Sequence, residues 1–291
     1  MKDRLEAWLV GALFWLLARL GPATASDIGG LVARTIGPLL PVSRVADGNL
    51  RLAMPELDRA ARRRIVRGVW DNLGRTAAEF PHVKHLRLTA AGPGFEVAGQ
   101  DVLDGLLAAG GPVVFVAGHF ANWEIAFALF RHYRRHAAPF YRKASNPLVD
   151  RIIVAARALE GLPQFAKGAA GARGAMLHLR DGGMLSALAD QKMNDGIAAT
   201  LFGHTAMTAS APAALALRFG CPLVPVRFVR LGPARVRVVF EPPLAVPASG
   251  DRNADVAALT QAVNDRIEAW ARACPDQWLW LHRRWPKEIM P

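Results

Sequence analysis

The chain has 291 residues, enough for one large domain or two small ones. Because 52% of them are hydrophobic, the chain can bury a substantial core, which excludes an intrinsically disordered protein. The formal net charge of +12 indicates an anionic partner: a nucleic acid, an anionic lipid surface, or a phosphorylated or acidic substrate. Cys221 and Cys274 have neither metal-like nor C-x-x-C spacing, so we predict no disulfide framework and expect a reducing compartment.

The most hydrophobic stretch covers residues 5–20, near the amino terminus. As a helix it would be about 24 Å long, which is shorter than the roughly 30 Å hydrocarbon core of a bilayer. We therefore expect a shallow or monotopic membrane anchor, with Trp8 and Trp15 near the lipid headgroups. Two alternatives stay open: a signal peptide cleaved near residues 23–25, and a helix buried in the protein core.

The pattern along the rest of the chain indicates an α/β protein. Helical periodicity predicts helices over residues 26–40, 59–79, 123–131, 148–159, 210–219 and 253–273. Short apolar runs predict strands over residues 112–117, 184–189, 223–230 and 234–240, and a Gly/Ala-rich flexible loop is expected over 167–174. Alternating strands and helices indicate a mixed, partly parallel sheet flanked by helices. We expect a hydrophobic helical segment over residues 1–40 and a single α/β domain over 41–291.

Polar side chains follow two of the predicted strands. His119, Asn122 and Glu124 come after the strand at 112–117, and Asp190 and Gln191 come after the strand at 184–189. Because ligands bind beyond the carboxyl ends of strands in open α/β sheets, we expect these side chains to share one cleft.

His119 and Glu124 have a spacing that suits proton transfer only in a particular local structure. On one continuous helix they would point about 140° apart, so they meet only if His119 lies in a loop and Glu124 lies in the first helical turn. A Glu124 carboxylate that accepts one imidazole N–H would fix the tautomer, and the other nitrogen would take a proton from a hydroxyl. The alternative is structural, with His119 capping the helix and Glu124 favoured there by the helix dipole.

The segment GHFANWE at 118–124 resembles the H-x4-D/E motif of glycerolipid-type acyltransferases, and its ending is similar to the bacterial lipid A late acyltransferases, the lauroyl/myristoyl transferases. Other stretches resemble that family in the same order along about residues 45–286: NL to PE at 49–56, YRKASNPL at 141–148, DQ at 190–191, FG at 202–203, LVPV at 223–226 and PDQWLWLHRRW at 275–285. The stretch after Gln191 departs from the family's more glycine-rich, doubly aromatic form.

This resemblance implies that the α/β domain over 41–291 is an acyltransferase domain, while the hydrophobic amino-terminal stretch predicts a membrane anchor over 1–40. The reaction it implies moves a fatty acyl chain from an acyl-carrier-protein thioester, or acyl-CoA, to a hydroxyl of a lipid A precursor. His119 would be the general base and Glu124 would orient it, while Arg142 would contact a substrate phosphate or the developing oxyanion. The resemblance also assigns substrate-binding positions to Asn122, Asn146, Asp190 and Gln191. No cofactor is implied. The histidine pairs His132–His136 and His82–His85 have no third partner with the spacing of metal ligands, so we expect no metal site.

The expected partners agree with the positive charge. An acidic glycolipid acceptor, acyl-carrier protein and the anionic inner-membrane surface all attract a basic protein, and thioester donors imply the cytoplasmic face of the inner membrane. Nucleic acid is not an expected partner. Two alternatives stay open. One is an acyltransferase on another glycolipid, such as a phosphatidylinositol mannoside. The other is a non-enzymatic basic protein that binds a membrane or a nucleic acid.

Overall fold

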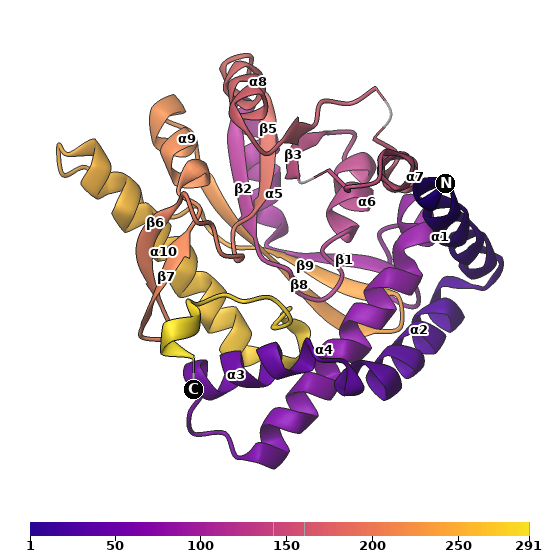
Figure 1. Cartoon of the computed structure of the whole chain (residues 1–291). Helices are drawn as coiled ribbons and strands as arrows, with labels where there is room; N and C mark the ends of the chain where they lie inside the picture. The colour runs from indigo at the N-terminus through magenta and orange to yellow at the C-terminus, as the bar shows by residue number, and fades with distance from the viewer. Residues whose placement is uncertain (142, 160, 291) are drawn as a thin grey trace.

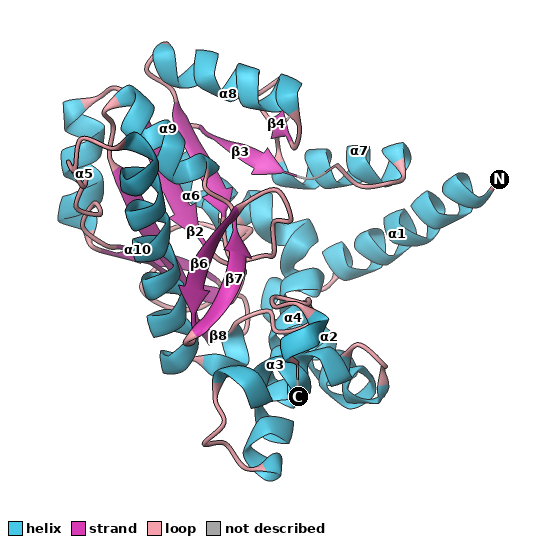
Figure 2. Cartoon of the chain, turned by 60° about the vertical axis from the view of Figure 1, so that its left-hand side comes forward, coloured by secondary structure: helices cyan, strands magenta, loops and turns pink. Residues whose placement is uncertain are grey.

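The computed structural model describes residues 1–141, 143–159 and 161–290. Its centre is a seven-stranded sheet in the order β1-β9-β8-β2-β5-β3-β4, and an antiparallel ribbon of β6 and β7 lies apart from it (Figures 1 and 2). The strands are β1 (Gly94–Ala98), β2 (Val113–Ala117), β3 (Ala137–Tyr141), β4 (Phe165–Ala166), β5 (Met184–Leu188), β6 (Ile197–Leu201), β7 (His204–Thr208), β8 (Leu223–Gly232) and β9 (Arg235–Phe240).

Neighbouring strands of the main sheet run parallel, except for the β8–β9 hairpin. Every residue of β2 is buried, as expected of a central parallel strand that is covered on both faces. The predicted α/β class, with a mixed, partly parallel sheet flanked by helices, is therefore confirmed, and the sheet is mostly parallel.

The helices are α1 (Lys2–Arg19), α2 (Pro22–Ile36), α3 (Ser43–Ala53), α4 (Arg59–Glu79), α5 (Gln100–Ala109), α6 (Ile125–His132), α7 (Pro147–Arg157), α8 (Ala169–Arg180), α9 (Ala211–Phe219) and α10 (Arg252–Ala273). Short 3₁₀ turns are η1 (Gly37–Leu39), η2 (Phe80–His85), η3 (Pro275–Gln277) and η4 (Lys287–Ile289). Helix α4 has the predicted bounds, and it begins where the Asp58 side chain accepts a hydrogen bond from the backbone N–H of Ala61.

Helices α2 and α4 pack closely because two glycines face each other. A Cβ added at Gly29 would lie 2.4 Å from the Gly74 carbonyl oxygen, and one added at Gly74 would lie 2.2 Å from the Gly29 carbonyl oxygen. The two backbones therefore touch at a crossing where neither helix has room for a side chain. This contact joins the amino-terminal helices to the part of the chain that carries the sheet.

Helix α1 lies at the edge of the molecule and extends away from it (Figure 2). Its surface is unusually apolar, since Trp8 and Trp15 are 66% and 59% exposed and several leucines are exposed beside them. Among the described residues, no helix has both the length and the hydropathy that a membrane crossing requires.

The glycine- and alanine-rich segment 167–174 does not form the flexible loop that we predicted. Most of it is the first half of α8, which packs against β4. A Cβ at Gly171 would lie 1.7 Å from the Ala166 carbonyl oxygen, and one at Gly174 would lie 2.9 Å from the Phe165 ring. The glycines therefore allow the helix to approach the strand closely.

Candidate active site

The candidate site lies where β2 and β5 end side by side. The two strands pair in parallel with Ala117 opposite Leu188, and the Ala189 backbone N–H donates to the Ala117 carbonyl at 2.9 Å. His119 and Asp190 are each two residues beyond these paired positions. The sheet register therefore brings the polar residues after both strands to one edge, as the sequence predicts.

The Asp190 carboxylate binds His119 twice. One oxygen is 2.7 Å from the imidazole Nδ1, and the other accepts the His119 backbone N–H at 2.8 Å. Asp190 is fully buried, while the His119 side chain keeps 17% of its surface exposed. An ionised carboxylate only accepts hydrogen bonds, so in the neutral ring Nδ1 carries the proton and Nε2 keeps its lone pair.

The charges of the pair stabilise each other. Burial lowers the pKa of His119, but the Asp190 charge, its hydrogen bond and the nearby Glu124 charge outweigh burial, so the pKa is raised. Burial raises the pKa of Asp190, but the charge and hydrogen bonds of His119 and the charge of His282 outweigh it, so the pKa is lowered well below its usual range. Asp190 is therefore a carboxylate throughout the physiological range.

The carboxyl-terminal segment contacts both members of the His119–Asp190 pair. Trp278 is buried and donates its indole N–H to Asp190 at 2.7 Å, and the Leu279 backbone N–H donates to the His119 carbonyl at 3.1 Å. The Trp123 ring packs edge-on against the imidazole with centroids 4.9 Å apart. In the described part of the chain nothing hydrogen-bonds to Nε2, so this nitrogen is available to an external group.

Glu124 does not make the predicted contact with His119. Its two oxygens accept hydrogen bonds from Arg157 on α7, from Nε and Nη2 at 2.7 Å each, and one oxygen also accepts the Trp123 indole N–H at 3.0 Å. Asp190 takes the place at Nδ1 because the β2–β5 register puts it beside the ring. Glu124 acts on His119 through its charge, since it contributes to the raised pKa of the imidazole.

A buried polar network fixes the loop between His119 and Glu124. Asn122 is fully buried, donates to Glu79 at 2.7 Å, and accepts the Glu124 backbone N–H at 3.1 Å. Glu79, also fully buried, forms an ion pair with Arg230. The Asn122 side chain is therefore engaged in hydrogen bonds within the protein and is not exposed to a substrate in this structure.

Ala121 lies in the left-handed region, with φ of 47°, which is unusual for a residue that has a Cβ. Its carbonyl accepts hydrogen bonds from Asn72 at 3.1 Å and Thr76 at 2.8 Å, and its N–H donates to the Gln277 carbonyl at 3.0 Å. Three contacts from two distant segments hold the residue in this conformation, as is typical of loops that position functional groups.

The remaining predicted positions are not gathered at the imidazole. Asn146 caps α7 by accepting the Leu148 N–H at 2.9 Å, and it donates to the Asp3 carbonyl at 2.8 Å on α1. Gln191 is exposed next to Asp190. Arg142 lies outside the described residues. The described residues contain no cluster of His, Cys, Asp or Glu suited to a metal ion.

Three residues that contact the candidate site residues were not predicted. Arg157 lies inside a predicted helix and has no local signal, since Glu124 is 33 positions away. Glu79 is the last residue of a predicted helix and likewise has no local signal, since its partner Asn122 is 43 positions away. Trp278 does belong to the carboxyl-terminal stretch that resembles the acyltransferase family, and that resemblance was the one available sign of its importance.

The fold and the site define an α/β protein with a carboxylate-held histidine that can accept a proton at the carboxyl edge of a parallel sheet. The family model described as "Bacterial lipid A biosynthesis acyltransferase" matches residues 2–287, which is nearly the whole chain. The protein therefore belongs to the bacterial lipid A biosynthesis acyltransferase family. A search of curated proteins gives no match.

Proposed function

We propose that this protein transfers a fatty acyl chain from an acyl-carrier-protein thioester, or acyl-CoA, to a hydroxyl of a lipid A precursor, with His119 as general base. Membership of the family supports acyl transfer in lipid A synthesis. The observation that carries the assignment to His119 is its contact with Asp190 at 2.7 Å, which leaves Nε2 free and basic.

In the proposed reaction, Nε2 takes the proton of the acceptor hydroxyl while the hydroxyl oxygen attacks the thioester carbonyl carbon. The carbon–sulfur bond of the tetrahedral intermediate then breaks, and the leaving thiolate takes the proton from the imidazolium. The products are an ester and a free thiol. Asp190 keeps Nδ1 protonated and stabilises the imidazolium that forms between the two steps.

In this proposal Glu124 has a supporting role. Its negative charge favours the imidazolium, and its ion pair with Arg157 ties the start of α6 to α7. We therefore expect Glu124 to act as an electrostatic and positioning residue, while Asp190 orients the ring.

The test incubates purified protein with acyl-carrier-protein thioesters, acyl-CoA and candidate glycolipids, and reads product masses. We expect an acyl gain on a lipid A precursor that is lost in His119→Ala and Glu124→Ala variants whose circular dichroism matches wild type. Near-wild-type turnover in His119→Ala refutes the general-base assignment. Acylation of a phosphatidylinositol mannoside instead keeps the chemistry and changes the acceptor. Salt-dependent DNA binding without acyl transfer favours the non-enzymatic alternative.

We also propose that the protein acts at the cytoplasmic face of the inner membrane, with α1 lying in the lipid interface. The exposed tryptophans and leucines of α1 support this proposal. Deleting residues 1–22 should weaken partition into membranes. The deletion also removes the contact between Phe14 and Phe80, whose ring centroids are 5.5 Å apart. A second variant with Trp8→Glu and Leu9→Glu therefore removes exposed apolar surface and keeps the helix and this contact. Unchanged partition of both variants refutes the anchor.

A further inference from the structure

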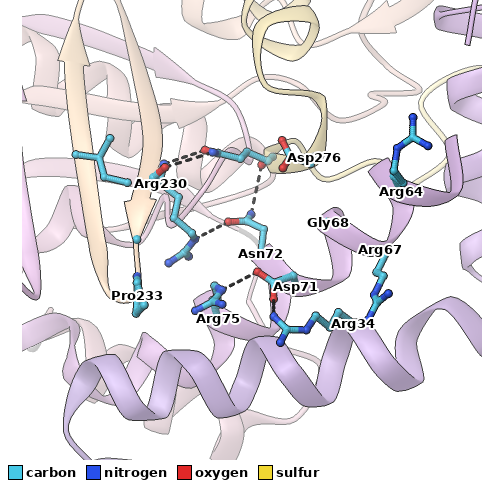
Figure 3. Close-up of a pocket in the computed structure, with 13 residues that line it drawn as sticks. Arg34, Arg64, Arg67, Gly68, Asp71, Asn72, Arg75, Arg230, Pro233 and Asp276 are labelled. Atoms are coloured by element: carbon cyan, nitrogen blue, oxygen red, sulfur yellow. Dashed lines mark hydrogen bonds and ion pairs between the residues drawn. The ribbon is translucent and has the colours of Figure 1, made fainter. Parts of the chain in front are cut away.

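A hollow of about 500 Å³ lies between α2, α4, the β8–β9 turn and η3 (Figure 3). None of its lining residues is His119, Glu124 or Asp190. It is set apart by its charge, because five of its lining residues are arginines: Arg34, Arg64, Arg67, Arg75 and Arg230. We call it the arginine pocket.

Three of these arginines are held in place by carboxylates. Asp71 accepts hydrogen bonds from Arg34 at 2.7 Å and from Arg75 at 2.6 Å, and its pKa is lowered because these bonds and charges outweigh its burial. Arg230 pairs with buried Glu79 and donates to Asn72 at 2.8 Å. The pocket wall is therefore a fixed frame of ion pairs.

The other two arginines supply the charge that is available to a ligand. Within the described residues, neither Arg64 nor Arg67 has an ion-pair partner, and both are exposed. They lie on α4 one turn apart and line the pocket together with Asp276 and Arg34. In Figure 3 Arg67 extends toward Arg34 on α2, while Arg64 lies further along α4. Asp276 also lines the pocket, and within the described residues its carboxylate forms no ion pair or hydrogen bond. The free positive charge of the pocket therefore comes from Arg64 and Arg67.

Guanidinium groups that approach from different elements suit a phosphate group, because each can donate two parallel N–H bonds to its oxygens. A phosphate monoester has up to two negative charges to match Arg64 and Arg67. The chemistry of the pocket therefore indicates a phosphate group, which either a free phosphate compound or a lipid headgroup carries.

The surface next to the pocket favours the lipid source. Helix α2, which contributes Arg34, also exposes Ile28, Leu31, Val32 and Ile36, whose spacing places them on one face of the helix. Leu31 lies one turn before Arg34, so the apolar face borders the pocket. A ligand that fits both surfaces has a phosphate group and apolar chains.

We propose that the arginine pocket binds the phosphate monoester of a lipid headgroup while the lipid chains lie against the exposed face of α2. The bound headgroup is then next to the loop that carries His119, because Asn72 and Gln277 line the pocket and both contact Ala121. The pocket is a binding site in its own right, and its test does not depend on acyl transfer.

The experiment measures sedimentation of the full chain with phosphatidylcholine vesicles that contain either phosphatidic acid, which has a phosphate monoester, or phosphatidylglycerol at equal charge. We expect tighter binding to phosphatidic acid. The double variant Arg64→Gln, Arg67→Gln should weaken binding to phosphatidic acid by about 10- to 30-fold. Asp276→Asn, which removes the unpartnered carboxylate, should strengthen it.

The matched control is Arg173→Gln with Arg218→Gln, which removes the same charge from exposed positions on α8 and α9. This control should bind almost as wild type does. Equal losses in the control and the pocket variant, equal affinity for the two vesicle types, or an unaffected pocket variant each overturn the proposal. Titration with inorganic phosphate tests the soluble source: affinity for free phosphate as high as for phosphatidic acid overturns the lipid assignment.

Discussion

His119 and Asp190 are 71 positions apart in the chain, yet one carboxylate binds both the ring and the backbone of the histidine. The two hydrogen bonds fix the position and the tautomer of the imidazole together. A carboxylate in this role does not exchange protons; it determines which ring nitrogen is available as a base.

Asp190→Asn should lower the acyl-transfer rate by about 10²- to 10⁴-fold, because an amide can donate to Nδ1 and thereby place the proton on the wrong nitrogen. Steady-state kinetics with the acyl-carrier-protein donor measure this loss. The control is Asp195→Asn, which makes the same chemical change at a side chain that is 74% exposed. If the two variants have equal activity, Asp190 does not orient the base.

The reaction should speed up with rising pH. His119 must be neutral to accept a proton, and its pKa is raised above the usual 6.5, so kcat/KM should reach half of its plateau above pH 6.5. In Asp190→Asn the charge that raises the pKa is gone while burial still lowers it, so the half-maximum should move to lower pH. Identical pH profiles for the two proteins contradict this prediction. Circular dichroism across the pH range excludes unfolding as the cause.

Arg157→Met should destabilise the fold by about 3–5 kcal/mol, because it leaves the buried Glu124 carboxylate without its partner. Adding Glu124→Gln should recover part of this loss, since the amide has no charge to bury. Urea unfolding measures the free energies. Arg180→Met is the control, because the Arg180–Asp181 pair is exposed and we expect a change below about 0.5 kcal/mol. Additive effects of the two substitutions argue against direct coupling.

Gly74→Ala should destabilise the protein by about 1–3 kcal/mol, because the new methyl group meets the Gly29 backbone and forces α2 away from α4. Gly105→Ala on α5 is the matched control. No atom lies within 4 Å of its added Cβ, so the better helix propensity should raise stability by about 0.5–1 kcal/mol. Thermal unfolding compares the two variants. A stable Gly74→Ala protein would mean that the crossing has room to adjust.

The sequence predicted elements best where a local signal exists. The bounds of α4 follow from its helical periodicity, and β2 follows from a continuous apolar run. Strand β3 was missed because its sequence, AAPFY, is rich in alanine and contains a proline. The ribbon of β6 and β7 was also missed, since its five-residue strands, IAATL and HTAMT, are rich in alanine and threonine and contain few large apolar strand-forming side chains.

The contrast between local sequence signals and tertiary packing also explains which parts of the site could be predicted. That Asp190 lies near His119 could be predicted, because the carboxyl ends of neighbouring parallel strands meet at one edge. Which carboxylate contacts the imidazole could not be predicted, because this depends on the β2–β5 register. The shorter separation along the chain favoured Glu124 instead. The ion pair of Glu124 with Arg157 depends on the packing of α7, which no spacing rule describes.

The hydrogen bond from Trp278 to Asp190 has a consequence for biosynthesis. The carboxylate is bound by residues 119 and 278, so the third part of the site leaves the ribosome 88 residues after Asp190 itself. A nascent chain with a completed central sheet still lacks the indole that fixes its buried carboxylate. During translation the protein therefore gains a complete proton acceptor only after Trp278 has emerged, well after both strands that carry His119 and Asp190.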